Sequence, residues 1–440
     1  MRLLKIILLV SVLSLLACTE IDEPISVPRD SSVTENSKYR TEAELKNIAL
    51  QAYSTIKGYD IEEVASRAGS SITITPILPR LSRASSDTLI QVVNYGNGRG
   101  FALVGAQKGS EDLLALVEEG DFNPIEVSQV EGFEDFISRA EYLLSAKPNI
   151  GDTAICQLNT KVEYVNTVTE FYGPHVSVQW GQRDYFGAYC PNNICGCVPL
   201  ATAMVMSYFE QPASMIYTFP ERDVQNSYLN WQSMKSHFKR HTDTWPQEWN
   251  GVQLPDASNC PATAIDHANL GRVVRQIGFV STPEYKPNVT IASTVLAVNY
   301  LMHNASDLRM QLYTSPEKEF INGLDEGVAI VDGWTGEDYT TSDGHCWVND
   351  GYAILGVLKK TYRNYHPDRY PEEWTLISSE VLEFKDLLHF NWGWNGKCNG
   401  YFLTNCYKPN EATQNDEGAS KGSIDDNFKF HNRFFLIQHK

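Results

Sequence analysis

One cysteine lies among the residue types that thiol chemistry needs. Cys197 begins an apolar stretch, and Gln182 lies upstream of it. His345 follows about 150 residues downstream, and Asn391 and Trp392 come later still. A thiol, an imidazole and a polar orienting group in this order can carry out nucleophilic attack on an acyl carbon. This set therefore predicts a cysteine peptidase.

Each of these side chains has a predicted role. We expect Cys197 at or just before a helix N-terminus, where the dipole and free N–H groups favour a thiolate, and Pro199 is tolerated in such a first turn. His345 would be the imidazolium partner of that thiolate. Gln182 and the Cys197 N–H would bind the oxyanion. Asn391 could accept a hydrogen bond from the imidazole ring, and Trp392 could shield that ring from water.

Other readings of these residues carry less weight. A cysteine near a helix start is by itself more often a buried, inert side chain. His237 and His241 are four residues apart but lack the intervening glutamate of a zinc peptidase helix. Cys190 and Cys195, with Cys197, do not have zinc-ligand spacing. We therefore expect no metal and no organic cofactor.

The N-terminal region predicts a small α+β unit. A capping box at Thr41–Glu44 precedes helical spacing of apolar residues over 45–56. Two strands, 89–95 and 101–106, are joined by a glycine-rich turn as a hairpin. A short helix over 111–118 is expected to end at a glycine. Residues 126–160 are a polar, helix-tending connection.

The larger C-terminal region predicts a helical half and a strand-rich half. After Cys197, helical spacing of apolar residues predicts a buried stripe, formed by Leu200, Ala201, Met204, Val205 and Tyr208. His345 opens an alternating strand that runs into a tight turn at 349–351, and 352–357 returns as a second strand. A cleft between two such halves suits a two-lobed thiol peptidase of α+β class.

The composition and the first residues limit the kind of protein and its location. The 440 residues exceed one ordinary domain, and a net charge of -18 argues against a nucleic-acid partner. Arg2 and Lys5 precede an apolar run over 6–17 that is too short to span a bilayer. The run ends before Cys18, as a bacterial lipoprotein signal does. We expect an exported protein with a lipid anchor at Cys18, facing the periplasm or the outside.

The nine cysteines permit disulfides if the protein is exported. Should Cys18 carry lipid and Cys197 be the nucleophile, seven remain, so at least one is free. The sequence leaves the connectivity open, with two candidate pairs. These pairs are Cys190 with Cys195, and Cys398 with Cys406.

These motifs together resemble the streptopain-like cysteine peptidases, a papain-fold family of exported bacterial proteins. The resemblance covers about 170–410 and rests on four motifs: Trp180-Gly181-Gln182, Gly196-Cys197-Val198, Gly344-His345 through Asp350-Gly351-Tyr352, and Asn391-Trp392-Gly393-Trp394 through Gly400-Tyr401-Phe402. It implies a zymogen whose N-terminal unit covers the cleft as an inhibitory propeptide. It also implies cleavage of proteins with a hydrophobic side chain two residues before the cut.

The chain departs from the family pattern at three places. Asp343 stands where a glycine often precedes the histidine motif, and Asn395 replaces a glycine after the second tryptophan. A proline common upstream of the histidine loop is absent from 327–330. These departures bear on substrate preference and loop geometry more than on the reaction itself.

The predicted layout has four parts: a lipoprotein signal peptide over 1–17, a linker over 18–40, an inhibitory propeptide-like domain over 41–145 and a papain-like catalytic domain over 146–440. Its partners would be protein or peptide substrates, its own propeptide and, through the anchor alone, a membrane. Two alternatives stay open. One is an acyltransferase of transglutaminase type, and the other is a catalytically silent lipoprotein that acts as a binding module.

Overall fold

The computed structural model describes most of the chain after residue 37. The signal peptide, Cys18, most of the linker, Cys156 and Cys260 lie outside the described residues. Those that are described are 38–60, 71–78, 88–146, 160–183, 185–237, 248–249, 252–253, 264–286, 290–335, 344–367, 369–370, 372–407 and 430–440.

The first helix, α1 (Glu42–Lys57), has the predicted capping box. The Thr41 hydroxyl accepts a hydrogen bond from the Glu44 N–H, and the Glu44 carboxylate accepts one from the Thr41 N–H. These bonds satisfy two of the N–H groups that a helix start leaves without partners. The apolar residues at helical spacing form its buried face, which confirms the prediction for this segment.

Four antiparallel strands follow α1 and form a meander. They are β1 (Thr73–Ile77), β2 (Ile90–Asn94), β3 (Phe101–Gly105) and β4 (Leu113–Val117). The predicted hairpin is confirmed as β2 and β3. The predicted helix over 111–118 is wrong, because this run is β4. Its five residues are all buried, and a short apolar run without alternation fits a central strand as well as a helix.

Two helices follow the meander: α3 (Pro124–Val127) and α4 (Glu131–Ala146). The helix tendency predicted for 126–160 is confirmed by α4, but the interpretation of this stretch as a polar connection is wrong for its first half. One face of α4 is fully buried, through Phe133, Phe136, Ile137 and Ala140. This helix is therefore part of the core, and only 147–159 lie outside the described residues.

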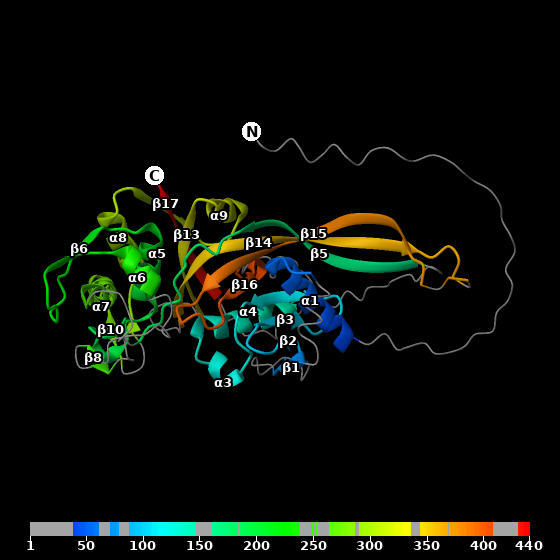
Figure 1. Ribbon diagram of the computed structural model, residues 1–440, viewed down its shortest axis with the longest axis horizontal. Helices are drawn as coiled ribbons and strands as arrows, with labels where there is room; N and C mark the ends of the chain where they lie inside the picture. Colours follow the sequence, from blue (N-terminus) through cyan, green and yellow to red (C-terminus); the bar gives the residue numbers. More distant parts are fainter. Residues whose placement is uncertain are drawn as a thin grey trace, which may run out of the picture. The chain divides into compact units, whose positions relative to one another are not determined.

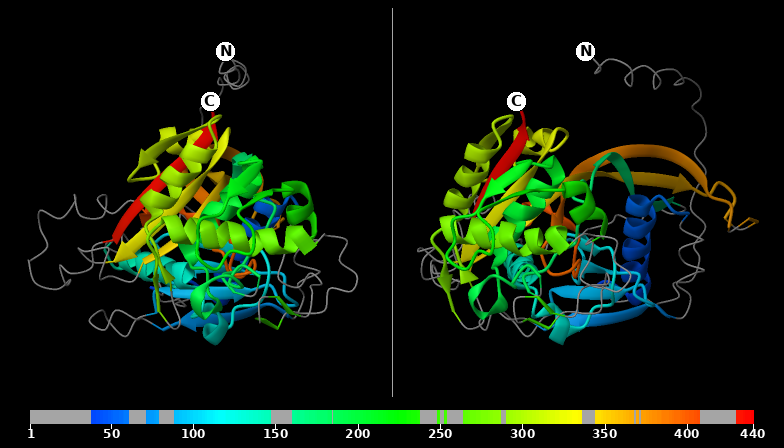
Figure 2. Two further views of the ribbon diagram at one scale, coloured as in Figure 1. Left: turned by 90° about the vertical axis from the view of Figure 1, so that its left-hand side faces the viewer. Right: turned by 60° about the vertical axis from the view of Figure 1, so that its left-hand side comes forward.

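A single large sheet runs through both regions of the chain. Its order is β1-β2-β3-β4-β16-β15-β14-β13-β17-β12, with β5 paired to β14 beside this path. β4 of the N-terminal region pairs directly with β16 of the C-terminal region. Figure 1 shows β5, β14 and β15 extending together as one long ribbon, and Figure 2 shows the C-terminal strand β17 beside β13. The strands not yet bounded are β5 (Thr160–Tyr172), β12 (Leu308–Tyr313), β13 (Gly327–Thr335), β14 (Gly344–Arg363), β15 (Thr375–Asn391), β16 (Gly400–Leu403) and β17 (Phe430–His439).

The predicted turn at 349–351 is wrong, because β14 continues through it. The register on β15 pairs Asn349 with Phe390 and Gly351 with His389, which leaves Asp350 without a partner residue. Such a β-bulge bends a strand and redirects one side chain, instead of reversing the chain. An Asp-Gly pair suits both arrangements, so local sequence alone could not distinguish them.

The helical half contains α5 (Cys197–Phe209), α7 (Ala264–Val280) and α8 (Thr294–Asn304). The predicted stripe on α5 is too narrow, since nearly every α5 residue after Cys197 is buried and Tyr208 is only half-buried. The smaller elements are η2 (Pro191–Asn193), β6 (Ser214–Ile216), β7 (Asn226–Tyr228), α6 (Trp231–His237), β8 (Glu248–Trp249), β9 (Val252–Gln253), β10 (Glu284–Tyr285), β11 (Thr290–Ile291), α9 (Lys318–Gly323) and η3 (Thr404–Tyr407).

Alternating residues of the sheet contribute to two hydrophobic cores. On β14, Cys346 and Val348 pack with the α5 side of the molecule, whereas Trp347 packs with Phe133 and Phe136 of α4. Successive strand residues point to opposite faces, so β14 separates the helical half from the N-terminal unit. The predicted α+β class, with a helical half and a β-rich half, is confirmed.

Neither candidate disulfide forms in the structure. Cys190, Cys195 and Cys398 carry free thiols. Within the part of the chain described here, no cluster of three or more His, Cys, Asp or Glu side chains could hold a metal ion. No helix of that part has the length and hydropathy of a membrane-spanning segment.

A buried lysine makes the fold sensitive to a single change. Lys385 of β15 forms ion pairs with Asp112, at the start of β4, and with Glu111 at 3.7 Å. Removing one partner of a buried ion pair leaves the other charge uncompensated, so Lys385→Met should lower the free energy of unfolding by about 3–5 kcal/mol. Urea unfolding of the full chain measures this effect.

A second ion pair between the same two regions provides a matched control. Lys397 and Glu126 form an exposed ion pair at 3.7 Å, and exposed pairs contribute little. Lys397→Met should therefore change stability by less than about 1 kcal/mol. Equal losses in the two variants would contradict the special role of Lys385.

Candidate active site

Cys197 is the first residue of α5, as predicted. Its N-cap, Gly196, has a φ of 91°, and a Cβ there would lie 2.9 Å from the Thr290 Cβ. Only glycine fits this backbone and this space without a shift. The glycine thus allows a close approach of β11 while the thiol stands at the end of the helix that carries positive partial charge.

Cys197 also differs from the other cysteines in exposure. It is half-buried, whereas Cys190, Cys195, Cys346 and Cys398 are buried. Burial raises the pKa of Cys190 and Cys398 to about 12, and it raises the pKa of Cys195 and Cys346 well above the usual range. These four side chains stay protonated thiols at neutral pH. Cys197 combines access to solvent with the electrostatics of a helix N-terminus, which a reactive thiol needs.

The His345 ring is oriented by a backbone carbonyl. Its Nε2 lies 3.1 Å from the Trp392 carbonyl oxygen, which can only accept a hydrogen bond, so Nε2 carries the proton. This bond fixes the tautomer and leaves Nδ1 as the nitrogen that can exchange a proton with a reacting group. His345 is 5% exposed and lies on the same face of β14 as Trp347.

Anions beside His345 keep it protonated. Burial alone would lower the pKa of His345, but the nearby Cys197 sulfur and the Glu131 carboxylate together raise it to about 10. Cys197 therefore acts directly on His345. The two side chains that the sequence pairs as thiolate and imidazolium are brought together by the fold.

The start of α4 closes over this pair. Glu131 lies 3.4 Å from His345 Nδ1, as an ion pair whose geometry is not that of an aligned hydrogen bond. Its close contact with the His345 ring holds the pKa of Glu131 below its usual value. A Cβ at Gly132 would lie 2.4 Å from a ring carbon of Trp392 and 2.7 Å from His345 Cδ2. The N-terminal region thus packs directly on the His345 imidazole.

Asn391 and Trp392 have different roles in the structure. The Asn391 amide donates to the Val178 carbonyl at 2.7 Å, and its oxygen accepts from the Gly393 N–H at 3.2 Å. The first bond joins the Trp392 loop to the irregular segment before Gln182, and the second lies within the loop. Trp392 contributes its carbonyl to His345, and its indole N–H donates to the Cys398 carbonyl at 2.9 Å. Its carbonyl therefore orients the ring, and the Asn391 amide does not.

Gln182 is half-buried and is fixed through its backbone. Its carbonyl accepts a hydrogen bond from the Cys195 N–H at 3.0 Å, two residues before Cys197. The preceding residues are joined to the Trp392 loop, since Trp180 accepts from the Asn395 N–H at 3.1 Å and Gly181 bridges to Trp394. Gln182 is thus held beside the loop that leads into Cys197.

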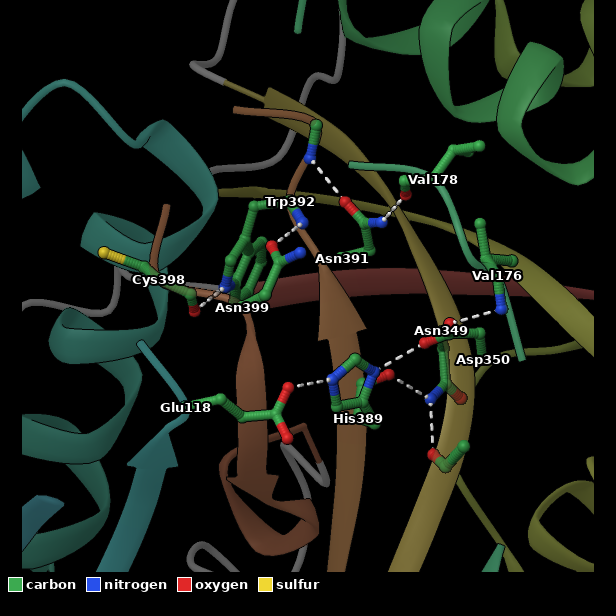
Figure 3. A network of polar contacts seen from close by, with 12 residues as sticks. Glu118, Val176, Val178, Asn349, Asp350, His389, Asn391, Trp392, Cys398 and Asn399 are labelled. Carbon is green, nitrogen blue, oxygen red and sulfur yellow. Dashed lines mark hydrogen bonds and ion pairs between the residues drawn. The ribbon is translucent and has the colours of Figure 1, made fainter. Parts of the chain in front are cut away.

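A second buried histidine lies deeper in the same region (Figure 3). His389 Nδ1 is 2.6 Å from an Asp350 oxygen, and Nε2 is 3.3 Å from a Glu118 oxygen. Burial lowers its pKa, but the two carboxylates, Asp350 first, raise it to about 9. Burial likewise opposes ionisation of Glu118, yet His389 and Lys57 lower its pKa to about 2. His389 is therefore an imidazolium that links β4 to β14.

Sequence reasoning missed three of these contributors. Glu131 and Gly132 lie in a segment that the sequence assigns to a polar connection, and nothing local marks them as neighbours of His345. His389 lies two residues before Asn391, but nothing in its local sequence pairs it with Asp350. One signal could have led to them: acidic residues of an inhibitory unit are expected to meet basic residues of the cleft.

An accessible thiol at a helix N-terminus beside a buried imidazolium defines a thiol hydrolase site. Comparison with known proteins identifies the family, because residues 180–402 match the model of the Peptidase C10 family. The chain therefore belongs to the peptidase C10 family, that of streptopain and interpain, and is a cysteine-type endopeptidase.

Two solved structures are among those similar to this chain. A fragment of Prevotella intermedia prointerpain A is 17% identical, covers 83% of this chain and 98% of its own, and has a TM-score of 0.47. The active wild-type interpain A cysteine protease of Prevotella intermedia is 16% identical, covers 61% of this chain and 95% of its own, and has a TM-score of 0.35. No curated protein sequence matches the chain.

The His389–Glu118 pair predicts a pH dependence of stability. The raised pKa of His389 means that its contribution is complete below about 6.5 and is lost as pH rises through about 9. The lowered pKa of Glu118 means that its contribution is complete above about 4.5 and is lost as pH falls through about 2. Thermal unfolding of the full-length Cys197→Ala protein should give the highest Tm between these limits.

The Cys197→Ala background matters in this experiment because it removes the sulfur that also raises the pKa of His345. Glu118→Gln should flatten the decline of Tm between pH 6.5 and 9. An unchanged decline in Glu118→Gln would show that another group causes it.

Proposed function

We propose that this chain is an exported cysteine endopeptidase that is made as a zymogen, with Cys197 as nucleophile and His345 as its acid–base partner. The observation that carries the proposal is the coupling of Cys197, which is half-buried while the other described cysteines are buried, to a buried imidazolium whose Nε2 is fixed by the Trp392 carbonyl. Membership of a peptidase family supports the reaction class.

The proposed reaction has two half-reactions. The Cys197 thiolate attacks the peptide carbonyl carbon and forms a carbon–sulfur bond, while Gln182 and the Cys197 N–H stabilise the oxyanion. His345 Nδ1 then gives its proton to the leaving amine as the carbon–nitrogen bond breaks. In the second half, His345 takes a proton from water, the hydroxide attacks the thioester, and the carbon–sulfur bond breaks to restore the thiolate.

The N-terminal region acts in this proposal as an intramolecular inhibitor. Glu131 competes with the Cys197 thiolate for the same nitrogen of His345, and Gly132 lets α4 approach the ring. Pairing of β4 with β16 holds the unit in the shared sheet. We place this unit at 41–145 and the catalytic domain at 146–440, with proteolysis between the two as the activating step.

The remaining parts of the proposal come from sequence. We place a lipoprotein signal at 1–17, a lipid anchor at Cys18 and a tether over 18–40, so that the enzyme is held at the bacterial envelope until it is processed. Its substrates would be proteins with a hydrophobic side chain two residues before the cleaved bond. No cofactor enters the reaction.

Replacement of the nucleophile tests the central proposal. Cys197→Ala should abolish casein cleavage and self-processing without changing the fold, since a methyl group cannot form the thioester. Cleavage is followed on gels, processing by mass spectrometry and the fold by circular dichroism. Cys346→Ala is the matched control, because it removes a buried thiol next to His345 and should keep activity.

The two alternatives give different results. Full casein cleavage by Cys197→Ala would end the proposal. Thiol-dependent incorporation of a primary amine into casein without cleavage would identify an acyltransferase. Absence of both reactions in the wild-type chain, before and after removal of the N-terminal unit, would identify a binding module.

The close contact at Gly132 tests the inhibitory role of α4. In Gly132→Ala the added methyl must displace the rings of His345 and Trp392 or lift α4 from them, although alanine favours the helix itself by about 1 kcal/mol. Full-length Gly132→Ala should therefore mature at least 10-fold faster than wild type, measured as the rate of processing by trace active enzyme. Ser145→Ala, at the exposed end of α4, is the control and should mature at the wild-type rate.

A further inference from the structure

The Asp350-Gly351 motif has no part in the reaction described so far. Asp350 is fully buried at the bulge of β14, where it has no partner residue on β15. A fully buried carboxylate is costly unless hydrogen bonds and an opposite charge compensate it. The bulge turns this side chain away from the pairing pattern of the strand, and its contacts show where it is directed (Figure 3).

Asp350 holds the beginning of the segment that ends in Gln182. One carboxylate oxygen accepts a hydrogen bond from the Val176 N–H at 2.8 Å, and the Asp350 backbone carbonyl accepts one from the His175 N–H at 3.0 Å. Gly173 lies so close that a Cβ there would be 2.4 Å from the same carbonyl. Residues 173–176 are thus fixed to β14 at the bulge.

His389 supplies the charge that Asp350 needs. Its Nδ1 donates to the other carboxylate oxygen at 2.6 Å, and both side chains are almost fully buried. Asn349 also holds His389, since its amide donates to the His389 carbonyl at 2.8 Å. The other groups that face the ring are Glu118, which Lys57 contacts in turn, the Tyr401 ring at 4.9 Å and the nearby His175.

We propose that His389 is a positioning residue of the peptidase reaction, which acts through Asp350 to fix the segment 176–182 and so places the Gln182 amide beside the oxyanion. The segment is held at its start by Asp350, at Val178 by Asn391, at Trp180 and Gly181 by the Trp392 loop, and at its end by Cys195. Of these attachments, only the one at Asp350 depends on a charged side chain, and that charge is compensated by His389.

The proposal separates two parts of the active site. His345 lies on β14 and Cys197 on α5, and no hydrogen bond among the described residues joins either of them to His389. Loss of His389 should therefore weaken stabilisation of the oxyanion while it leaves formation of the thiolate intact. A residue that merely supported the fold would affect both.

Glu118 connects this residue to the N-terminal unit. In the full-length chain it binds Nε2 of His389, so departure of the unit removes one of two anions from the ring. Asp350 remains, and a neutral ring with its proton on Nδ1 can still donate to it. The clamp on 176–182 thus persists in the processed enzyme.

The test compares two reactions of Cys197 in matured enzyme. Alkylation by iodoacetamide requires the thiolate but forms no oxyanion, whereas hydrolysis of a peptide substrate requires both. His389→Leu should lower kcat by about 10- to 100-fold, with little change in KM. This loss is no larger than the loss caused by removing one oxyanion donor. Its alkylation rate should stay within 2-fold of wild type.

Two further variants keep the test decisive if leucine disturbs folding. His389→Asn places an amide N–H where Nδ1 stands and should restore kcat to within a few-fold of wild type. Tyr401→Phe removes a hydroxyl beside His389 that has no hydrogen-bond partner, and should behave as wild type. Gln182→Ala combined with His389→Leu should be no slower than Gln182→Ala alone, because both changes act on the same donor.

The proposal fails if kcat is unchanged in His389→Leu, if alkylation and hydrolysis fall together in His389→Asn, or if the losses from Gln182→Ala and His389→Leu multiply. The positioning role of His389 rests on the proposed function, but different results would contradict the two proposals. Hydrolysis by Cys197→Ala would overturn the function itself, whereas a normal His389→Leu enzyme with an inactive Cys197→Ala would overturn only the positioning role.

Discussion

The hydrogen bond from His345 to the Trp392 carbonyl is the constraint on which the site depends. It decides which ring nitrogen faces Cys197, and it is available only because the 391–399 loop is rigid. That loop is fixed from inside by Asn399, which accepts from the Trp392 N–H at 3.1 Å, and from the other half of the site by Asn391. A backbone carbonyl has no rotamer to lose, so a single side-chain change does not delete this acceptor. The tryptophan side chain, buried against Trp347 and Phe402, then keeps water away from the bond.

The N-terminal unit uses the same core that supports this loop. Phe133 and Phe136 of α4 pack with Phe402, and β4 extends the sheet beyond β16. Removal of the unit therefore exposes apolar surface and a sheet edge, both of which cost free energy. In the proposed zymogen this cost would make spontaneous release rare, so that activation would need a covalent cut. Latency would then be a property of the folded core, with the contacts at His345 adding direct competition.

The sequence predicted the chemistry better than the arrangement that controls it. Cys197 at a helix start, the capping box at Thr41 and the hairpin of β2 and β3 follow from local rules, because each depends on residues a few positions apart. Three predictions failed for one physical reason: the deciding contacts are long-range. Residues 113–117 form a strand because β3 and β16 flank them, Asp350 continues a strand because His389 compensates its charge, and 131–146 belong to the core because Trp347 and Trp392 lie opposite. The sequence alone reveals neither the contact of Glu131 with His345 nor the hydrogen bond that the Trp392 carbonyl accepts from His345.

The charges at the interface show how latency and catalysis use the same groups. In the full-length chain two histidines, His345 and His389, are each held between two anions, and in each case one of the two belongs to the N-terminal unit. If that unit leaves, as proposed, each imidazole keeps one of its two partners. For His389 the remaining partner is Asp350, so the pair stays structural. For His345 it is Cys197, so in the proposed mechanism the competing carboxylate gives way to the nucleophile itself. Because an imidazolium flanked by one anion holds its proton less tightly than one flanked by two, release of the unit would lower the pKa of His345 toward the range in which it can both give and take a proton during turnover.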